Sequence, residues 1–183
     1  LDPKYRYLGI VATLRSWKGH QYLLEAFAQL DAPGWKLLII GEGPQTENIQ
    51  AKIVSLNLHD KVLLVGQKTD PETWMQALDI FCLPSYANEG VPQSIMQAML
   101  TGLPIVTTPV GAILEAVDNH QTALVVPPMN VLSLSEAIGQ LMTNPELAEK
   151  LGREARQQGE TRFSLQGMLL RMEQIFLDAT KAA

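Results

Sequence analysis

Apolar residues along this chain fall in short runs that alternate with amphipathic stretches. The runs predict strands, because they are short and are bounded by Gly, Pro and polar residues. They cover 6–14, 35–41, 61–66, 80–85, 103–109 and 123–128. Helical spacing or helix-start signals between them predict helices over 19–30, 41–58 (after a turn), 70–79, 92–101 and 111–117. This alternation predicts a Rossmann-like α/β fold, a doubly wound parallel six-stranded sheet covered on both faces.

After residue 130 the pattern is helical only, and extra helices are predicted over 131–142, 145–159 and 164–183. We expect residues 1–183 to form a single domain. The first strand begins after only five residues, which suggests that the chain starts at a domain boundary.

Composition narrows the class of protein. The chain has 183 residues, of which 46% are hydrophobic and 18% charged, as in a folded globular domain with a sizeable core. The net charge is −5 and Lys and Arg do not cluster, which argues against a nucleic-acid partner. The single cysteine, Cys82, excludes an internal disulfide. No apolar run approaches the ~18 residues of a membrane span, and without a signal peptide a cytoplasmic location is expected.

The stretch 89–104, EGVPQSIMQAMLTGLP, contains the clearest candidate site. Pro92 suits the first helical position, and Gly102 suits the left-handed end of the helix. Such a helix start presents free backbone N–H groups, here those of Val91, Gln93 and Ser94, which favour a phosphate. Glu89 lies just ahead, where a carboxylate would accept hydrogen bonds from hydroxyls. Phosphate plus hydroxyls predicts a nucleotide sugar as the ligand.

In an open parallel sheet, ligands bind outside the carboxyl ends of the strands. The loops that follow the first four predicted strands are polar, and they should lie along one edge. The first of these loops carries Arg15 and Lys18, which are candidates to bind an anion. The null hypothesis is that both are solvated loop residues.

The same stretch resembles a known family. The retaining glycosyltransferases with two Rossmann-like domains (GT-B fold, GT4-like) share a frame E-G-x-P, then E-A-M, then G-x-P. The residues that match are Glu89, Gly90, Pro92, Ala98, Met99, Gly102 and Pro104. The position of the second glutamate holds Gln97 instead. The resemblance covers nearly the whole chain.

The resemblance implies that this chain is the C-terminal, donor-binding half of such an enzyme, and that the N-terminal acceptor domain is absent from it. The complete enzyme would transfer a sugar from a nucleoside diphosphate sugar to an acceptor hydroxyl, in polysaccharide biosynthesis, without a metal or cofactor. The full-length enzyme could associate peripherally with the inner face of the membrane. The last helix would then either pack on its own domain or dock on the missing one.

The resemblance also assigns roles to residues. Lys18 and Arg15 would hold the diphosphate, although Ala12 and Thr13 depart from the family's G-R-L pattern in that loop. Glu89 would bind hydroxyls of the donor sugar. The remaining implied donor contacts are Gly41, Gly43, Gly66, Gln67, Gly90, Val91, Gln93, Ser94 and Gln97. Gly66 and Gln67 would lie against the nucleobase, and Gln97 would give weaker or altered ribose recognition, because an amide offers only one accepting oxygen.

Other functions are weighed against this one. A nucleotide-binding module without transfer activity would keep the same site. A nucleotide-sugar epimerase would need paired acids and a histidine in the cleft, where the sequence offers only Glu89. A dinucleotide oxidoreductase is disfavoured because the turn 41–46, GEGPQT, lacks the third glycine of that fingerprint. His20, His59 and His120 do not have the spacing of a zinc site.

Overall fold

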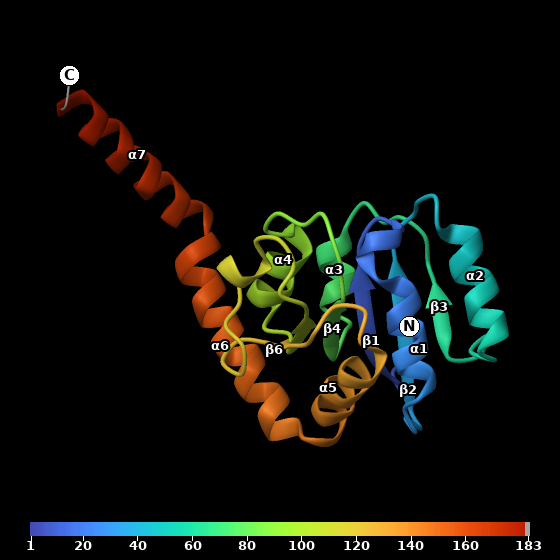
Figure 1. The fold of residues 1–183 in the computed structure, drawn as a ribbon. Coiled ribbons are helices and arrows are strands. Elements are labelled where there is room, and N and C mark those ends of the chain that lie inside the picture. The colour runs from blue at the N-terminus through green and yellow to red at the C-terminus, as the bar shows by residue number, and fades with distance from the viewer. Residues whose placement is uncertain (182–183) are drawn as a thin grey trace.

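A computed structural model describes residues 1–181 of the chain. The centre is one parallel sheet of six strands in the order β3-β2-β1-β4-β5-β6 (Figure 1). The strands are β1 (Arg6–Val11), β2 (Trp35–Ile40), β3 (Val62–Leu64), β4 (Ile80–Leu83), β5 (Ile105–Thr107) and β6 (Leu124–Val125). The predicted Rossmann-like fold class is confirmed. Most residues of β1 and β2 and all residues of β4 and β5 are buried, as strands covered on both faces require.

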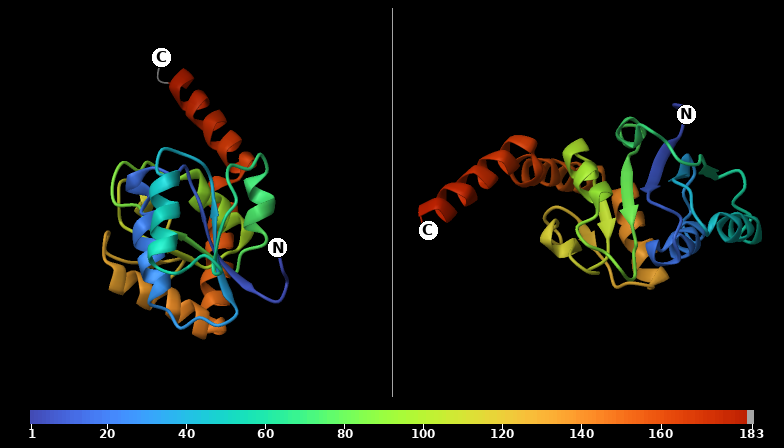
Figure 2. Two further views of the ribbon diagram at one scale, coloured as in Figure 1. Left: turned by 90° about the vertical axis from the view of Figure 1, so that its right-hand side faces the viewer. Right: turned by 90° about the horizontal axis from the view of Figure 1, so that it is seen from above.

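Helices cover both faces of the sheet. They are α1 (His20–Ala28), α2 (Thr46–Ser55), α3 (Pro71–Met75), α4 (Gln93–Thr101), α5 (Val131–Thr143), α6 (Pro145–Phe163) and α7 (Leu165–Lys181), with 3-10 turns η1 (Ser16–Lys18) and η2 (Ile113–Glu115). Helices α1, α2 and α5 lie on one face, and α3, α4 and α6 lie on the other (Figure 2). Where a helix was predicted over 111–117, the structure has only the short 3-10 turn η2. The sheet is doubly wound, as expected.

The order of the strands reverses between β1 and β4. Strand β1 pairs with β4 on one side and with β2 on the other. The chain leaves β1 toward one face and leaves β4 toward the opposite face, so the two loops diverge over a crevice. Ligands of open α/β sheets bind at this position.

The last helix, α7, projects away from the rest of the molecule (Figure 1). Its apolar side chains are exposed, including those of Met172 (44%), Ile175 (65%) and Phe176 (64%). Its contacts are with α6, from which it is separated at Ser164, where the backbone is extended (φ −71°, ψ 146°). The alternative in which this helix packs on its own domain is therefore wrong. The predicted helix included residues 182–183, which lie outside the described residues.

Candidate functional site

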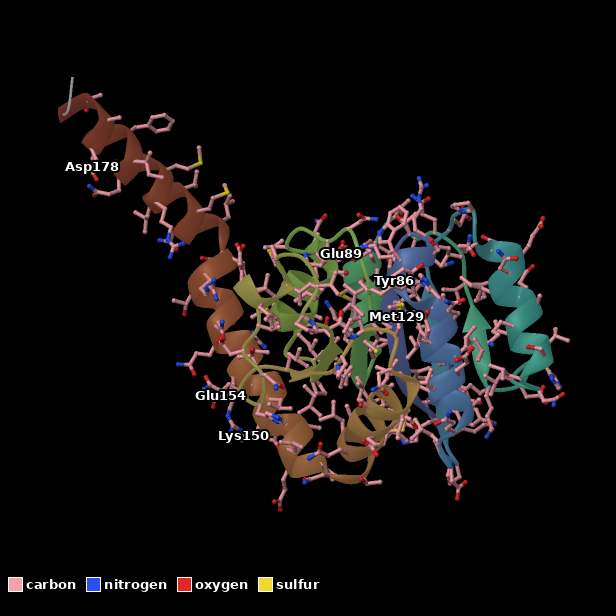
Figure 3. All side chains as sticks on the ribbon, viewed as in Figure 1. Tyr86, Glu89, Met129, Lys150, Glu154 and Asp178 are labelled. Atoms are coloured by element: carbon pink, nitrogen blue, oxygen red, sulfur yellow. The ribbon has the colours of Figure 1, made fainter. Side chains whose placement is uncertain are left out.

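The loops that follow β1 and β4 are joined across the crevice. The Tyr86 N–H donates a hydrogen bond of 2.8 Å to the Trp17 carbonyl. Gly19 has φ +76°, and a Cβ there would lie 2.0 Å from the Pro84 carbonyl oxygen. Only glycine permits both this backbone conformation and this approach. Figure 3 shows Tyr86 and Glu89 together at this edge of the sheet.

Lys18, from the loop after β1, and Glu89, from the loop after β4, form an ion pair. The Lys18 Nζ lies 2.6 Å from the Glu89 Oε1, and the side chains are 18% and 4% exposed, respectively. The residues are 71 positions apart in sequence. The structure thus brings together two side chains that the sequence analysis singled out, and their roles toward a ligand stay predictions.

Buried groups that the sequence analysis missed hold Glu89 in place. The Ser85 hydroxyl donates a 2.6 Å hydrogen bond to the Glu89 Oε1, and Thr108 donates to the Ser85 carbonyl. Behind the loop, a Cβ on Gly111 would lie 1.8 Å from the Glu89 carbonyl oxygen. The hydrogen bonds of residues 1–181 use Oε1 and leave Oε2 as an acceptor. The sequence did contain a signal for this contact, because Ser85 lies at the end of a buried strand and four residues before Glu89.

Helix α4 begins beside this carboxylate, but one residue later than predicted. Pro92 is the N-cap, with extended backbone (φ −67°, ψ 129°), and is not the first helical residue. Its carbonyl accepts hydrogen bonds from the N–H groups of Ile95 (3.1 Å) and Met96 (3.3 Å). The N–H groups of Gln93 and Ser94 precede these bonds and have no intrahelical acceptor. Gly102 ends the helix with φ +80°, as predicted.

The glycines of the turn 41–46 bring loops together. A Cβ on Gly41 would lie 2.0 Å from the Ala12 carbonyl oxygen, and a Cβ on Gly43 would lie 2.7 Å from that of Leu14. Their close approach is therefore to the loop after β1. The Gly41 N–H also donates to the Gly66 carbonyl, and all three glycines line one open pocket. A donor contact at these glycines stays a prediction.

The other predicted residues are more dispersed. Gly90 and Gln67 lie exposed in their loops, and a Cβ on Gly90 would meet nothing within 4 Å. Val91 precedes the cap of α4 and packs partly against the core. Gln97 lines a groove with Glu72, Gln76 and Arg156, between α3, α4 and α6.

Arg15 does not point into the crevice with Lys18. Its guanidinium lies 5.6 Å from the ring centroid of Trp17, and its side chain lines a different groove, between α1 and α2. Its predicted role toward the diphosphate stays a prediction.

Three further findings concern the described residues. Across residues 1–181, His, Cys, Asp and Glu do not gather into a group of three or more that could bind a metal ion. In the same part of the chain, no helix is both long and apolar enough to cross a membrane. Burial raises the pKa of the Cys82 thiol, which is a core residue as expected.

This chain is similar to a known protein family and to several characterised proteins. The model of the family glycosyl transferases group 1 matches residues 1–158. An exopolysaccharide phosphotransferase from Streptomyces coelicolor is 35% identical over 86% of this chain, which is 17% of that protein. The lipopolysaccharide core biosynthesis mannosyltransferase LpsB from Rhizobium meliloti is 29% identical over 81% of this chain and 45% of its own length. The chain thus spans less than half of these relatives.

Solved structures share the fold. HepE from Anabaena, in complex with UDP and glucose, has a TM-score of 0.88 at 22% identity, over 98% of this chain and 49% of its own. Sucrose-phosphate synthase from Thermosynechococcus elongatus has a TM-score of 0.88 at 26% identity, over 100% of this chain and 47% of its own. The C-terminal domain of LpcC from Francisella tularensis has a TM-score of 0.80 at 22% identity, over 87% of each chain.

Proposed function

The chain belongs to the glycosyl transferases group 1 family, and on that premise we propose that it is the donor-binding half of a retaining, metal-independent glycosyltransferase. The observation that carries the proposal is the crevice at which Lys18, Glu89 and the start of α4 meet. A cation and free backbone N–H groups suit a diphosphate, and a carboxylate with an open oxygen suits sugar hydroxyls. A nucleoside diphosphate sugar has both features.

The ion pair is compatible with a bound donor. An ammonium has three N–H donors, so Lys18 can keep Glu89 and still donate to a phosphate oxygen. Glu89 offers Oε2 to a hydroxyl of the sugar. A unit charge about 4 Å from a phosphate oxygen contributes about 4 kcal/mol at an effective dielectric constant near 20, before desolvation. Such an interaction would stabilise the charge that develops on the leaving diphosphate.

In the reaction, the bond from the anomeric carbon to the diphosphate breaks. A bond from that carbon to the acceptor oxygen forms on the same face of the sugar, and the acceptor proton passes to an oxygen of the departing diphosphate. The diphosphate takes the electron pair of the broken bond, and Lys18 and the N–H groups of Gln93 and Ser94 bind it.

The acceptor would bind to a second domain. The relatives are about twice as long as this chain or longer, which supports an additional N-terminal domain. Asp178, near the free end of α7, and Glu89 both lie toward the upper side of the molecule in Figure 3. We propose that α7 docks its apolar side chains on that second domain. We expect the isolated chain to bind donor weakly and to transfer little sugar.

A thermal-shift screen of the chain with UDP-, GDP- and ADP-sugars tests the proposal, since a ligand that binds only the native state raises the melting temperature. The UDP complex of HepE makes UDP-sugars the first choice. A Lys18→Met variant should lose at least tenfold in affinity, whereas Lys61→Met, which removes an exposed lysine far from the crevice, should not change it. The absence of any shift with all three donors would contradict donor binding.

A second candidate function has its own support. The Streptomyces coelicolor relative is a phosphotransferase, and this chain matches only 17% of it. A nucleotide-binding module could therefore belong to a protein whose chemistry occurs in another domain. The departure at Gln97 fits such a module. An assay of the full-length protein for sugar transfer from the donor found in the screen separates the two functions.

A further inference from the structure

The groove between the first turns of α1 and α2, here the α1–α2 groove, is separate from the crevice at Lys18 and Glu89. Both helices lie side by side on one face of the sheet (Figure 2). The polar lining of the groove includes Arg15, His20, Gln21, Gln45, Asn48 and Lys52. The space measures about 90 Å³, whereas one water needs about 10–15 Å³. The groove can therefore accommodate a group larger than a single water.

His20 is a buried polar side chain without a partner. It is 2% exposed, and neither ring nitrogen has a hydrogen-bond partner among the described residues. Burial lowers its pKa to about 4, the charge of Lys18 acts in the same direction, and the nearby backbone of Arg15 acts in the opposite direction. At neutral pH the ring is uncharged, with one N–H donor and one acceptor nitrogen. Buried groups of this kind normally have a hydrogen-bond partner, whereas the ring nitrogens of His20 have none among the described residues.

The electrostatics of the groove favour an anion. Helices α1 and α2 both follow parallel strands, so their positive N-terminal ends lie at the same edge of the sheet. Neither helix has a side-chain cap. Leu23 and Ile49 donate the first i→i−4 bonds, which leaves the N–H groups one turn earlier without an intrahelical acceptor. Arg15 adds a positive charge, and no carboxylate lines the groove.

Lys52 contributes less. Its Nζ lies 2.5 Å from the Glu25 Oε1, so most of its charge is already neutralised. Arg15 is the cation that the groove itself provides, because its guanidinium is paired with the Trp17 ring and with no carboxylate among residues 1–181.

We propose that the α1–α2 groove is a second binding site, which takes one phosphate group through Arg15, the His20 ring and the free N–H groups of both helices. This site is independent of the donor site and gives the domain a second anionic ligand. The phosphate can be free inorganic phosphate or the terminal phosphate of an organic monoester. The two sources share the same recognition chemistry.

An NMR titration of the 183-residue chain with inorganic phosphate near neutral pH tests the site directly. The amide signals of Gln21 and Asn48 and the ring nitrogen signals of His20 should shift together, with one dissociation constant in the millimolar range. A parallel titration with glycerol 3-phosphate distinguishes the sources. Equal affinity indicates that the phosphate alone is recognised, and at least tenfold tighter binding indicates an organic monoester.

Three variants make the test specific. Asn48→Asp places a negative charge in the groove at an exposed position and should weaken phosphate binding at least tenfold. Ala51→Asp adds the same charge on the same helix outside the groove and should change it less than twofold. His20→Leu fills the same space with an apolar side chain and removes both ring nitrogens. It should weaken phosphate binding at least fivefold, while the circular dichroism spectrum of the chain stays unchanged.

The proposal fails if phosphate shifts no signal of the groove up to about 50 mM, a concentration at which a site of millimolar affinity is nearly saturated. It also fails if Asn48→Asp binds phosphate as the parent chain does, or if the only amides to shift are those of Gln93 and Ser94. A separate titration with UDP reports on those two amides. Failure of this inference and failure of the donor site are therefore distinguishable.

Discussion

Ser85 is the residue that most directly fixes the orientation of Glu89. It is fully buried and donates to Oε1, while Oε2 is proposed to bind the sugar. In Ser85→Ala, Glu89 loses that hydrogen bond, which is worth about 1.4 kcal/mol as a bond to a charged group. We expect about tenfold weaker binding of the donor sugar nucleotide. Binding of the nucleoside diphosphate alone should change less than twofold, as measured by calorimetry.

Ser133→Ala is the matched control for that prediction, because Ser133 lies on α5, away from the crevice, and its hydroxyl makes no described hydrogen bond to the site. It should leave both affinities unchanged. An equal loss for the sugar nucleotide and the diphosphate in Ser85→Ala would show that Ser85 supports the fold of the loop and does not position Glu89.

His20 predicts a pH dependence of stability. Its pKa is about 4 in the folded chain and about 6.5 in the unfolded chain, so between these values the unfolded chain binds a proton that the folded chain does not. The stabilisation is complete above pH 6.5 and is lost as the pH falls toward 4, by roughly 3 kcal/mol in total. Urea unfolding at about pH 7 and about pH 4.5 in phosphate-free buffer measures this loss.

In His20→Leu that component of the pH dependence should disappear. His59→Gln, which changes an exposed histidine, should retain it. A His20→Leu chain that still loses the same stability between these pH values would show that other groups cause the loss.

At the scale of the elements, the places of the six strands along the chain and their parallel arrangement could be predicted from the sequence, but the ends of the strands could not. The apolar run 6–14 continues past β1, because Ala12 and Leu14 are apolar yet belong to the following loop. The Leu14 N–H donates to the Glu42 carbonyl, a bond between loops that no local pattern reveals. Likewise Gly111, with φ +59°, leads into a 3-10 turn where helical spacing predicted a helix.

The candidate site shows the same division. The resemblance and the helix-start signals pointed to Lys18 and Glu89, because charged residues in loops at strand ends are visible in sequence. Ser85 and His20 were missed because their importance depends on burial, and burial of a polar side chain depends on contacts that are remote in sequence. Arg15 was predicted beside Lys18 from proximity in sequence, but the η1 turn separates their side chains.

A proline substitution can test whether the backbone N–H groups at the start of α4 bind the diphosphate. Gln93 is the first helical residue, where proline is well accommodated, and the preceding Pro92 already has the extended backbone that a following proline requires. Gln93→Pro removes one N–H and should weaken nucleoside diphosphate binding about fivefold to tenfold, because a charge-assisted hydrogen bond is lost. Calorimetry measures the change.

Gln93→Ala is the control, since it shortens the same side chain and keeps the N–H. It should bind the diphosphate as the parent chain does. If Gln93→Pro also binds normally, with its helix content unchanged, the backbone of α4 does not contact the diphosphate.

At the scale of the whole molecule, the chain combines a well-packed domain with one helix that lacks a partner within it. The core joins both faces of the sheet into a single cluster, whereas the apolar side chains of α7 remain exposed. Sequence periodicity predicted that α7 is amphipathic but left open what covers it. The extended backbone at Ser164, which directs the helix away from the domain, is that of an N-cap serine, whose hydroxyl accepts a 3.1 Å hydrogen bond from the Gly167 N–H.

If α7 docks on an N-terminal domain, the loss of its apolar side chains should matter only where that domain is present. The double variant Met172→Gln and Phe176→Gln changes two exposed residues on one side of α7. In the 183-residue chain, its unfolding free energy should change by less than about 0.5 kcal/mol, as for exposed positions in general. In the two-domain protein, burial of each side chain would stabilise the fold by about 1.5–3 kcal/mol. Calorimetry of the variant should therefore show a melting temperature lower by several degrees.

The control, Gln166→Ala with Gln174→Ala, replaces polar residues of the same helix and should have little effect in either protein. Equal effects of the apolar variant in both proteins would exclude a dock that depends on the second domain, and loss of self-association in the short chain would identify a second copy as the partner.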